Sequence, residues 1–265
     1  MVWRYLTELS AGRRTPRADR HLGYVLTFVA GAVNAGGFLA IGQYTSHMTG
    51  IVSSMADHLA LGGFAAGLAA LAAWMAFVSG AATTAVLVNL ARRRHLRSHF
   101  ALVLFFEATL LLLFGTAGAW LAEMHDLLAP VTVLLLCYIM GLQNAVITKA
   151  SGASIRTTHL TGTTTDLGIE LGKLLYRNRR VMPRLTVRAD RVKLGLYVRL
   201  MGSFLIGGVS GALSFKHIGY GAAGFLAAIL ALIAAGPILT DIYVRWKRFA
   251  RRNLRATKQS AVTDQ

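Results

Sequence analysis

Long runs without a charged residue constrain the fold of this chain more than any other feature of its sequence. Four such runs are 21, 29, 22 and 23 residues long: Leu22–Gly42, Gly63–Ala91, Leu127–Thr148 and Ile218–Thr240. A helix needs about 20 apolar residues to cross the hydrocarbon core of a bilayer. Two further runs hold one charged residue each, Phe100–Leu121 and Leu194–Phe215. We therefore predict an all-α membrane protein with six transmembrane helices.

The composition excludes the main alternatives to this class. Hydrophobic residues make up 55% of the chain and charged residues 15%, against about 25% charged in a typical soluble domain. The mean hydropathy is +0.53. Cys137 is the only cysteine, which excludes a scaffold held together by disulfides. The apolar runs also lack the alternation that an outer-membrane barrel requires.

The basic residues orient the predicted helices. Although the formal net charge is +17, 27 of the 28 basic residues fall in segments that six spans place on one face, and only Lys216 falls opposite. The positive-inside rule then predicts a multi-pass protein of the bacterial inner membrane with both termini cytoplasmic. The basic run Arg177–Lys193 has no aromatic residue, so we interpret it as a segment facing anionic lipid headgroups and predict no nucleic-acid partner.

Two matched segments indicate an internal duplication. The sequence of Thr45–Gly50, TSHMTG, returns at Thr157–Gly162 as TTHLTG, and upstream of each copy a glycine is followed three residues later by Asn-Ala, at Asn34 and Asn144. Each copy contains three spans, and an odd number of spans turns the second copy over in the membrane. We therefore predict two inverted three-helix repeats, each with a polar break and a short helix after its first span.

This organisation divides the chain into four parts. We expect a basic cytoplasmic N-terminal segment, a first repeat, a second repeat that includes the basic cytoplasmic loop 177–193, and a basic cytoplasmic tail. Their ranges are 1–21, 22–121, 127–242 and 243–265.

The same motifs carry a resemblance to a known family. From Gly23 to about Arg248, the G-x-x-N-A and H-[M/L]-T-G pairs resemble those of the YoaK-like family of bacterial inner-membrane proteins. The resemblance implies a six-span inner-membrane protein. It implies no activity, because that family is uncharacterised.

Asn34 and Asn144 are candidate functional residues because a side-chain amide without a hydrogen-bond partner inside an apolar span destabilises the fold by several kcal/mol. A structural interpretation gives each an interhelical hydrogen bond. A functional interpretation gives each a contact with a substrate, or makes each the cap of an unwound segment.

The repeated turns form the second candidate. Thr49 and Thr161 are predicted N-caps of short helices, Ile51–Leu61 and Thr163–Tyr176, which lie either re-entrant in the membrane or at its interface. A glycine turn at a helix start leaves free N–H groups that suit an anionic or polar ligand. We therefore predict a substrate site made of both turns and both asparagines: Asn34, Thr45, His47, Thr49, Gly50, Asn144, Thr157, His159, Thr161 and Gly162.

Three residues could couple transport to protons. A histidine pair such as His47 and His159 can couple transport to protons, and Glu107 is a carboxylate within a span. The histidines could instead cap helices or bond within their own loops, and Glu107 could contact a loop arginine. The sequence has no cluster of ligands at metal spacing and no cofactor motif, so we predict neither a metal nor a cofactor.

We expect a secondary transporter or permease for a small polar or anionic solute, which could be proton-coupled. The alternatives are a passive inverted-repeat channel and a non-transporting membrane protein in assembly, lipid interaction or signalling. An enzyme is not expected, because no catalytic motif is found. The expected partners are the solute, membrane lipids and a second copy of the chain in a homo-oligomer.

Overall fold

Long helices make up almost the whole of the computed structural model, which describes residues 15–123, 125–178 and 186–263. No strand occurs in these residues. The helices are α2 (Pro16–Ile41), α3 (Met48–Ala60), α4 (Phe64–Arg93), α5 (Ala101–Glu123), α6 (His125–Ala150), α7 (Leu160–Leu175), α8 (Arg191–Ile218) and α9 (Ala222–Thr263), with a short 3-10 turn, η1 (Gly219–Gly221), between the last two.

Five stretches of the described chain are long and apolar enough to cross a membrane. The last of them, Arg191–Lys247, is 57 residues long and contains α8, η1 and the first part of α9. The chain is therefore a multi-pass helical membrane protein, as predicted. Most of the predicted N-terminal segment 1–21, and residues 179–185 of the basic loop 177–193, lie outside the described residues.

The first long helix begins earlier than its uncharged run. Thr15 is the N-cap of α2, and its Oγ1 accepts a hydrogen bond from the Ala18 N–H at 3.2 Å. Pro16 follows at the first helical position, where its missing N–H costs nothing. Gly42 ends the helix in the left-handed region, with φ of 70°, which glycine adopts without steric cost. The polar break thus begins where the sequence places it.

The two short helices that follow the breaks begin three residues before the predicted starts. Their N-caps are His47 for α3 and His159 for α7, so the prediction that Thr49 and Thr161 are N-caps is wrong. The reason lies in the turn before each helix, where Asn34 and Asn144 hydrogen-bond the residues directly before the histidines. The chain is fixed there and becomes helical immediately afterwards.

Close helix crossings join parts of the chain that are far apart in sequence. A β-carbon at Gly31 of α2 would clash with the Phe204 carbonyl of α8, and one at Gly207 of α8 would clash with the Phe28 carbonyl of α2. Only glycine permits backbones to approach so closely. Further along the same pair Gly36 meets Phe215, so α2 and α8 run parallel.

A second pair of helices crosses in the same way. A β-carbon at Gly80 of α4 would clash with the Tyr138 carbonyl of α6, and one at Gly141 of α6 would clash with the Phe77 carbonyl of α4. Thr84 also donates a hydrogen bond of 3.0 Å to the Leu142 carbonyl. Earlier along both helices Ala73 of α4 packs with Cys137 of α6, so α4 and α6 are parallel as well.

The third pair, α5 and α9, is antiparallel. Gly115 near the end of α5 lies against Tyr220 and Ala223 at the start of α9, whereas Ser98 just before α5 donates its N–H to the Asp241 carboxylate. The main core consists chiefly of buried side chains of α2, α5, α6 and α9, with Val88 of α4 and Leu200 and Phe215 of α8.

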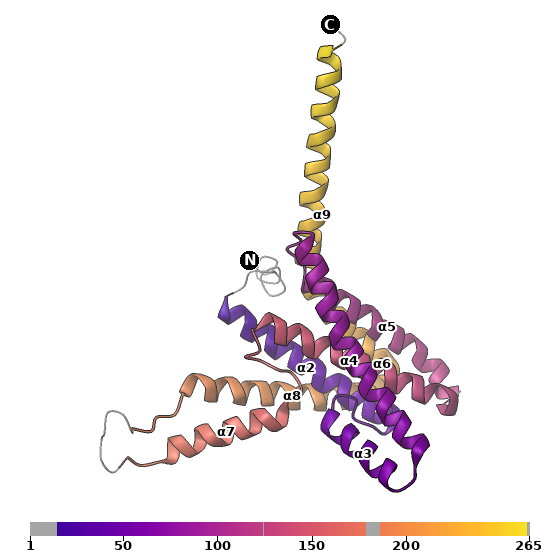
Figure 1. The fold of residues 1–265 in the computed structure, drawn as a ribbon, viewed down its shortest axis with the longest axis vertical. Coiled ribbons are helices and arrows are strands. Elements are labelled where there is room, and N and C mark those ends of the chain that lie inside the picture. Colours follow the sequence, from indigo (N-terminus) through magenta and orange to yellow (C-terminus); the bar gives the residue numbers. More distant parts are fainter. Residues whose placement is uncertain (1–14, 124, 179–185, 264–265) are drawn as a thin grey trace.

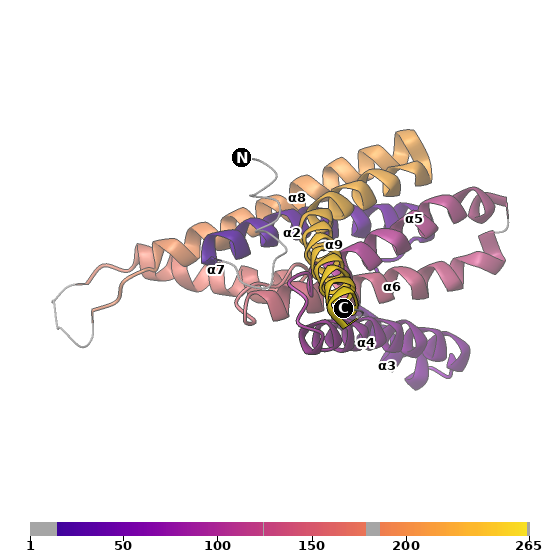
Figure 2. The ribbon, with the colours of Figure 1, turned by 90° about the horizontal axis from the view of Figure 1, so that it is seen from above.

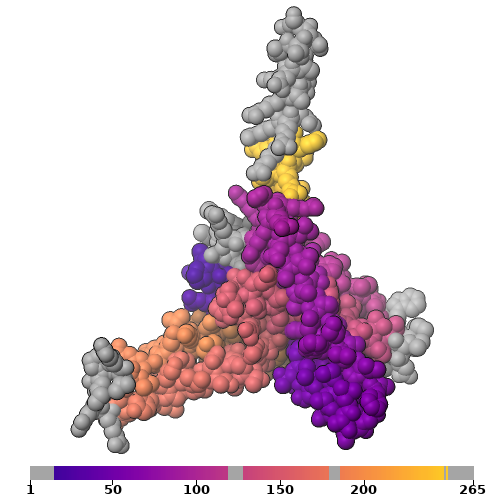
Figure 3. All heavy atoms as spheres, in the orientation of Figure 1, coloured from indigo at the N-terminus to yellow at the C-terminus, as the bar shows by residue number. Residues whose placement is uncertain are grey.

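Three parts of the chain project from this core. Figure 1 shows α7 with the first half of α8, α3 with α4, and the C-terminal half of α9 as a single rod. The space-filling view shows the projections of α7 with α8 and of α3 with α4 pointing in different directions (Figure 3).

Candidate functional site

One cavity of about 580 Å³ is lined by both polar breaks. The first break contributes Ser46–Thr49 and the second contributes Thr158–Thr161, and side chains of α4 and α6 form the remaining wall. The lining residues from these two helices and the second break are Phe77, Ala81, Ala85, Asn144, Ala145, Thr148, Lys149 and Arg156. Residues more than 100 positions apart in the sequence thus meet at one place.

The two asparagines hold the breaks in shape. Asn144 Oδ1 accepts hydrogen bonds from Thr157 Oγ1 at 3.1 Å, from Thr158 Oγ1 at 3.0 Å and from the Thr158 N–H at 3.4 Å. Asn34 Oδ1 accepts from Ser46 Oγ at 2.9 Å and from the Ser46 N–H at 3.3 Å. Of the alternatives open from the sequence, the capping of an unwound segment describes both residues.

The two histidines occupy equivalent positions at the cavity. Each is the N-cap of its helix, makes no side-chain capping hydrogen bond, and is exposed. Each imidazole lies over the glycine three residues later, so a β-carbon at Gly50 or Gly162 would meet the ring. The first turns of α3 and α7 therefore begin at the cavity wall, each with a histidine beside it.

The charge of the cavity wall is positive. Lys149 and Arg156 line it together with the two histidines, and its lining contains no carboxylate. Helix N-termini carry a partial positive charge and unbonded N–H groups. Cationic side chains next to helix N-termini favour a small anion such as an oxyanion or a carboxylate.

Not every predicted site residue lines the cavity. Thr45 and Thr157 are buried beneath the turns, at 0% and 1% exposure, and Gly50 and Gly162 lie under the histidine rings. Asn34 supports the first break from α2 without lining the cavity. These five residues shape the site, and His47, Thr49, Asn144, His159 and Thr161 line it.

Glu107 lies away from the cavity. It is fully buried on α5, and its Oε1 accepts a hydrogen bond of 2.9 Å from Gln143 Nε2 of α6. The alternative contact with a loop arginine is therefore not what the structure contains. Gln143 precedes Asn144, so one turn of α6 bonds the buried carboxylate and also holds the second break.

The sequence reasoning missed Lys149 and Arg156 as site residues, because it assigned both to the basic cytoplasmic face. Their position between Asn144 and His159, inside the repeated motif, was the signal that could have identified them. Among the described residues, no group of three or more His, Cys, Asp or Glu side chains could hold a metal ion.

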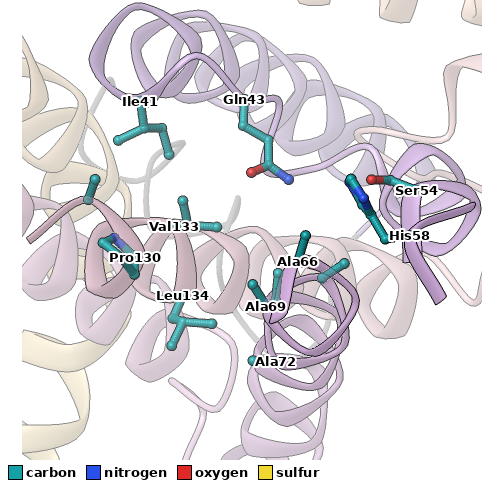
Figure 4. Close-up of a pocket in the computed structure, with 13 residues that line it drawn as sticks. Ile41, Gln43, Ser54, His58, Ala66, Ala69, Ala72, Pro130, Val133 and Leu134 are labelled. Atoms are coloured by element: carbon teal, nitrogen blue, oxygen red, sulfur yellow. The ribbon is translucent and has the colours of Figure 1, made fainter. Parts of the chain in front are cut away.

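A second cavity, of about 550 Å³, lies further along α3, toward its C-terminal end (Figure 4). Gln43 of the first break and Ser54 and His58 of α3 face the alanines of α4 and the start of α6. A small apolar cluster separates this cavity from the first one. It consists of Ile51, Ala73 and Cys137, all at most 3% exposed, with Met48, Phe77, Val133 and Leu134 packed around them.

These features define a multi-pass helical membrane protein with a cavity between two similar breaks, whose wall carries Lys149, Arg156 and two histidines. The chain belongs to the family described as protein of unknown function (DUF1275), which it matches over residues 22–236. This match confirms the resemblance to a YoaK-like uncharacterised family. Neither the curated proteins nor the solved structures contain a match to the chain.

Proposed function

We propose that this protein is a secondary transporter for a small anionic solute, built of two inverted repeats with six spans. The observation that carries the proposal is the cavity that both polar breaks line, with Lys149, Arg156 and two histidines in its wall. Inverted-repeat transporters typically bind their substrates between the repeats, at helices that begin within the membrane.

The matched glycine crossings support the repeat independently of the sequence motif. The crossing positions on α2 are Phe28 and Gly31, and those on α6, Tyr138 and Gly141, come 110 residues later in each case. The crossing positions on α4 and α8 likewise differ by 127 residues, as Gly80 and Gly207 do. Duplication followed by conservation of the packing accounts for both offsets.

The helix directions support an inverted arrangement of the two repeats. With six spans in alternation, α2 and α8 both run outward, α4 and α6 both run inward, and α5 and α9 run in opposite directions. These are the parallel and antiparallel relations that the crossing contacts give. The same topology leaves both termini in the cytoplasm of a bacterium.

The position of α3 supports a re-entrant helix over an interfacial one. Its last turn lies at the start of α4, where Leu59 contacts Gly67, whereas its first turn lies at the middle of α4, where Met48 and Ile51 pack near Phe77. α3 therefore runs from the centre of the membrane to the outer surface. Its N-terminus, like that of α7, faces the solute cavity.

Two cavities with a partition between them favour a transporter over an open channel. A channel needs a continuous pore, whereas Ile51, Ala73 and Cys137 fill the space between the two cavities. Alternating access requires such a barrier on one side of the bound solute. Movement of α3 away from α4 would open it.

The test is uptake into proteoliposomes of four radiolabelled anions, namely nitrate, sulfate, phosphate and acetate, at several internal and external pH values. We expect saturable uptake of at least one of them. His159→Gln should keep the protein folded but remove the pH dependence, because glutamine retains hydrogen bonding and does not titrate. His217→Gln, at an exposed histidine of α8 outside the cavity, is the matched control.

Absence of saturable uptake of all four anions, in protein shown to be folded, would contradict the proposal. Uptake that rises without saturation and carries current would favour the channel. Retained pH dependence in His159→Gln would remove this histidine from the coupling mechanism and leave Glu107 and His47 as the candidates.

A further inference from the structure

The C-terminal half of α9 presents an apolar stripe outside the bundle. The helix leaves the bundle beyond Asp241, whose Oδ2 accepts a 2.8 Å hydrogen bond from the Ser98 N–H, and its backbone continues as helix to Thr263. Beyond this contact the side chains of Ile242, Tyr243 and Trp246 are 58%, 58% and 65% exposed.

These side chains lie on one face of the helix. The apolar positions are Leu239, Ile242, Tyr243, Trp246 and Phe249, which recur at intervals of three and four residues, and all five are more than half exposed. Intervals of three and four residues place side chains on the same side of an α-helix. Exposure of this apolar stripe to water would be unfavourable, so we expect a partner to cover it.

The opposite face is strongly basic. Seven lysines and arginines lie between Arg245 and Lys258, and the chain has no acidic residue from Ile242 to Thr263. Arg248 and Arg255 follow Trp246 by two and nine residues, which is about 200° and 180° around a helix. The apolar stripe and the basic residues are therefore on opposite sides.

The direction of the tail helix fits a membrane surface. Figure 2 looks along its axis while α2, α5, α6 and α8 lie across the view, so the tail runs at a large angle to these four helices. It starts beside Ser98, directly after the basic turn Arg92–Arg97, which the proposed topology places at the cytoplasmic boundary. A helix that starts at this level and turns away from the direction of these four helices is placed to bind the membrane surface.

We propose that residues 242–263 form an amphipathic helix that binds the anionic cytoplasmic leaflet. The stripe of Ile242, Trp246 and Phe249 enters the boundary between headgroups and acyl chains, and the basic face contacts lipid phosphates. Tyrosine and tryptophan favour this depth because they combine an apolar ring with a polar atom. A second copy of the tail is a poorer partner, because two chains with seven positive charges each repel. The inference rests on the proposed topology and is independent of transport.

The experiment uses the full chain in lipid nanodiscs, which leave both faces accessible. Trypsin cleaves after the basic residues of the tail, and mass spectrometry of the released peptides gives the cleavage rate. We expect cleavage to be about tenfold slower in nanodiscs containing phosphatidylglycerol than in nanodiscs of phosphatidylcholine alone. Phe249→Glu should abolish this protection. Gln259→Glu is the matched control, because it adds the same charge on the basic side of the helix, about 280° around the helix axis from Phe249. It should keep most of the protection.

Equal cleavage rates in the two lipid mixtures would overturn the proposal. Protection that depends on protein concentration and not on phosphatidylglycerol would overturn it in favour of a tail that binds a second copy. Because the measurement involves no solute, it can succeed where anion uptake fails, and the reverse also holds.

Discussion

Asn34 and Asn144 hold the backbone of the two polar breaks in place. Each amide oxygen accepts hydrogen bonds from the turn that follows its helix, two in the first copy and three in the second. A break inside a membrane leaves N–H groups without water, and each unpaired group costs several kcal/mol. The asparagines remove part of that cost. In both copies the asparagine bonds the Ser or Thr directly before the histidine, through its N–H and its hydroxyl.

At the residue scale, the glycines beneath the histidines allow a test of the imidazole position without removing the imidazole. A β-carbon at Gly162 would lie 2.6 Å from His159 Nε2, so Gly162→Ala must move the ring. Alanine favours the helix by about 1 kcal/mol relative to glycine, so α7 should remain folded. We expect anion uptake to fall with a raised KM, measured in proteoliposomes.

Gly168→Ala provides the comparison on the same helix, because nothing lies within 4 Å of the added carbon. It should raise the thermal stability slightly and leave uptake unchanged. Similar loss of uptake in both variants would mean that flexibility of α7, and not the position of His159, is what the glycines provide.

At the scale of elements, side chains of α3, α4 and α6 form the partition between the two cavities, and Cys137, the only cysteine of the sequence, lies in it. Cys137 is 0% exposed and packs against Ile51 of α3. Ile51→Ala should open the partition and make Cys137 react faster with N-ethylmaleimide in detergent-solubilised protein. Removing the side chain should also cost about 2–5 kcal/mol of stability.

A second core truncation distinguishes local opening from general loosening. Leu230→Ala removes a side chain that is fully buried in the main core and distant from the partition. It should destabilise the protein to a similar extent without raising the reactivity of Cys137. Equal reactivity in the two variants would contradict a partition that α3 controls.

The contact between α7 and α8 should depend on pH. Glu170 accepts hydrogen bonds of 2.7 Å from Lys173 Nζ and from the Asp190 N–H, and Asp190 is the N-cap of α8. These bonds, that of Lys173 first, lower the pKa of Glu170 below its ordinary value. A lowered pKa in the folded state means that the contact stabilises the fold at neutral pH and is lost as the pH falls through that lowered value.

Hydrogen exchange of the Asp190 amide measures this contact. We expect this amide to be protected at neutral pH. The protection, corrected for the intrinsic exchange rate, should decrease when the pH is lowered below the ordinary pKa range of a carboxyl group. Glu170→Gln should show low protection of the Asp190 amide at neutral pH and at acidic pH. Asp57→Asn, at an exposed carboxylate of α3, should behave as the wild type. Protection that does not change with pH would show that other contacts hold α7 to α8.

The order of helices and breaks could be predicted because charge-free length and the repeated motif are local signals. The start of each short helix could not, because it depends on hydrogen bonds from Asn34 and Asn144 across 12 to 14 residues. The basic members of the site were missed for a related reason. Lys149 and Arg156 have the same sequence signature as topology charges, and only their packing beside α4 identifies them as cavity residues.

At the scale of the whole molecule, the proposed topology predicts the sidedness of each connection. Reporter fusions after Arg97 and after Arg188 should be cytoplasmic, and a fusion near Asp126 should be external. The physical reason is the concentration of Lys and Arg in the connections that contain Arg97 and Arg188. An external reporter at Arg188 would exclude both the six spans and the inversion of the second repeat.

The crossings also bear on how such a chain is made. The glycine face of α2 is covered by α8, whose first residue follows the last residue of α2 by 150 positions, and α4 is likewise covered by a helix of the other half. During synthesis the first half therefore enters the bilayer with its closest packing surfaces still open to lipid. The helices of each half pack most closely against helices of the other half. Two half-length chains would therefore have to be produced together to give a stable protein.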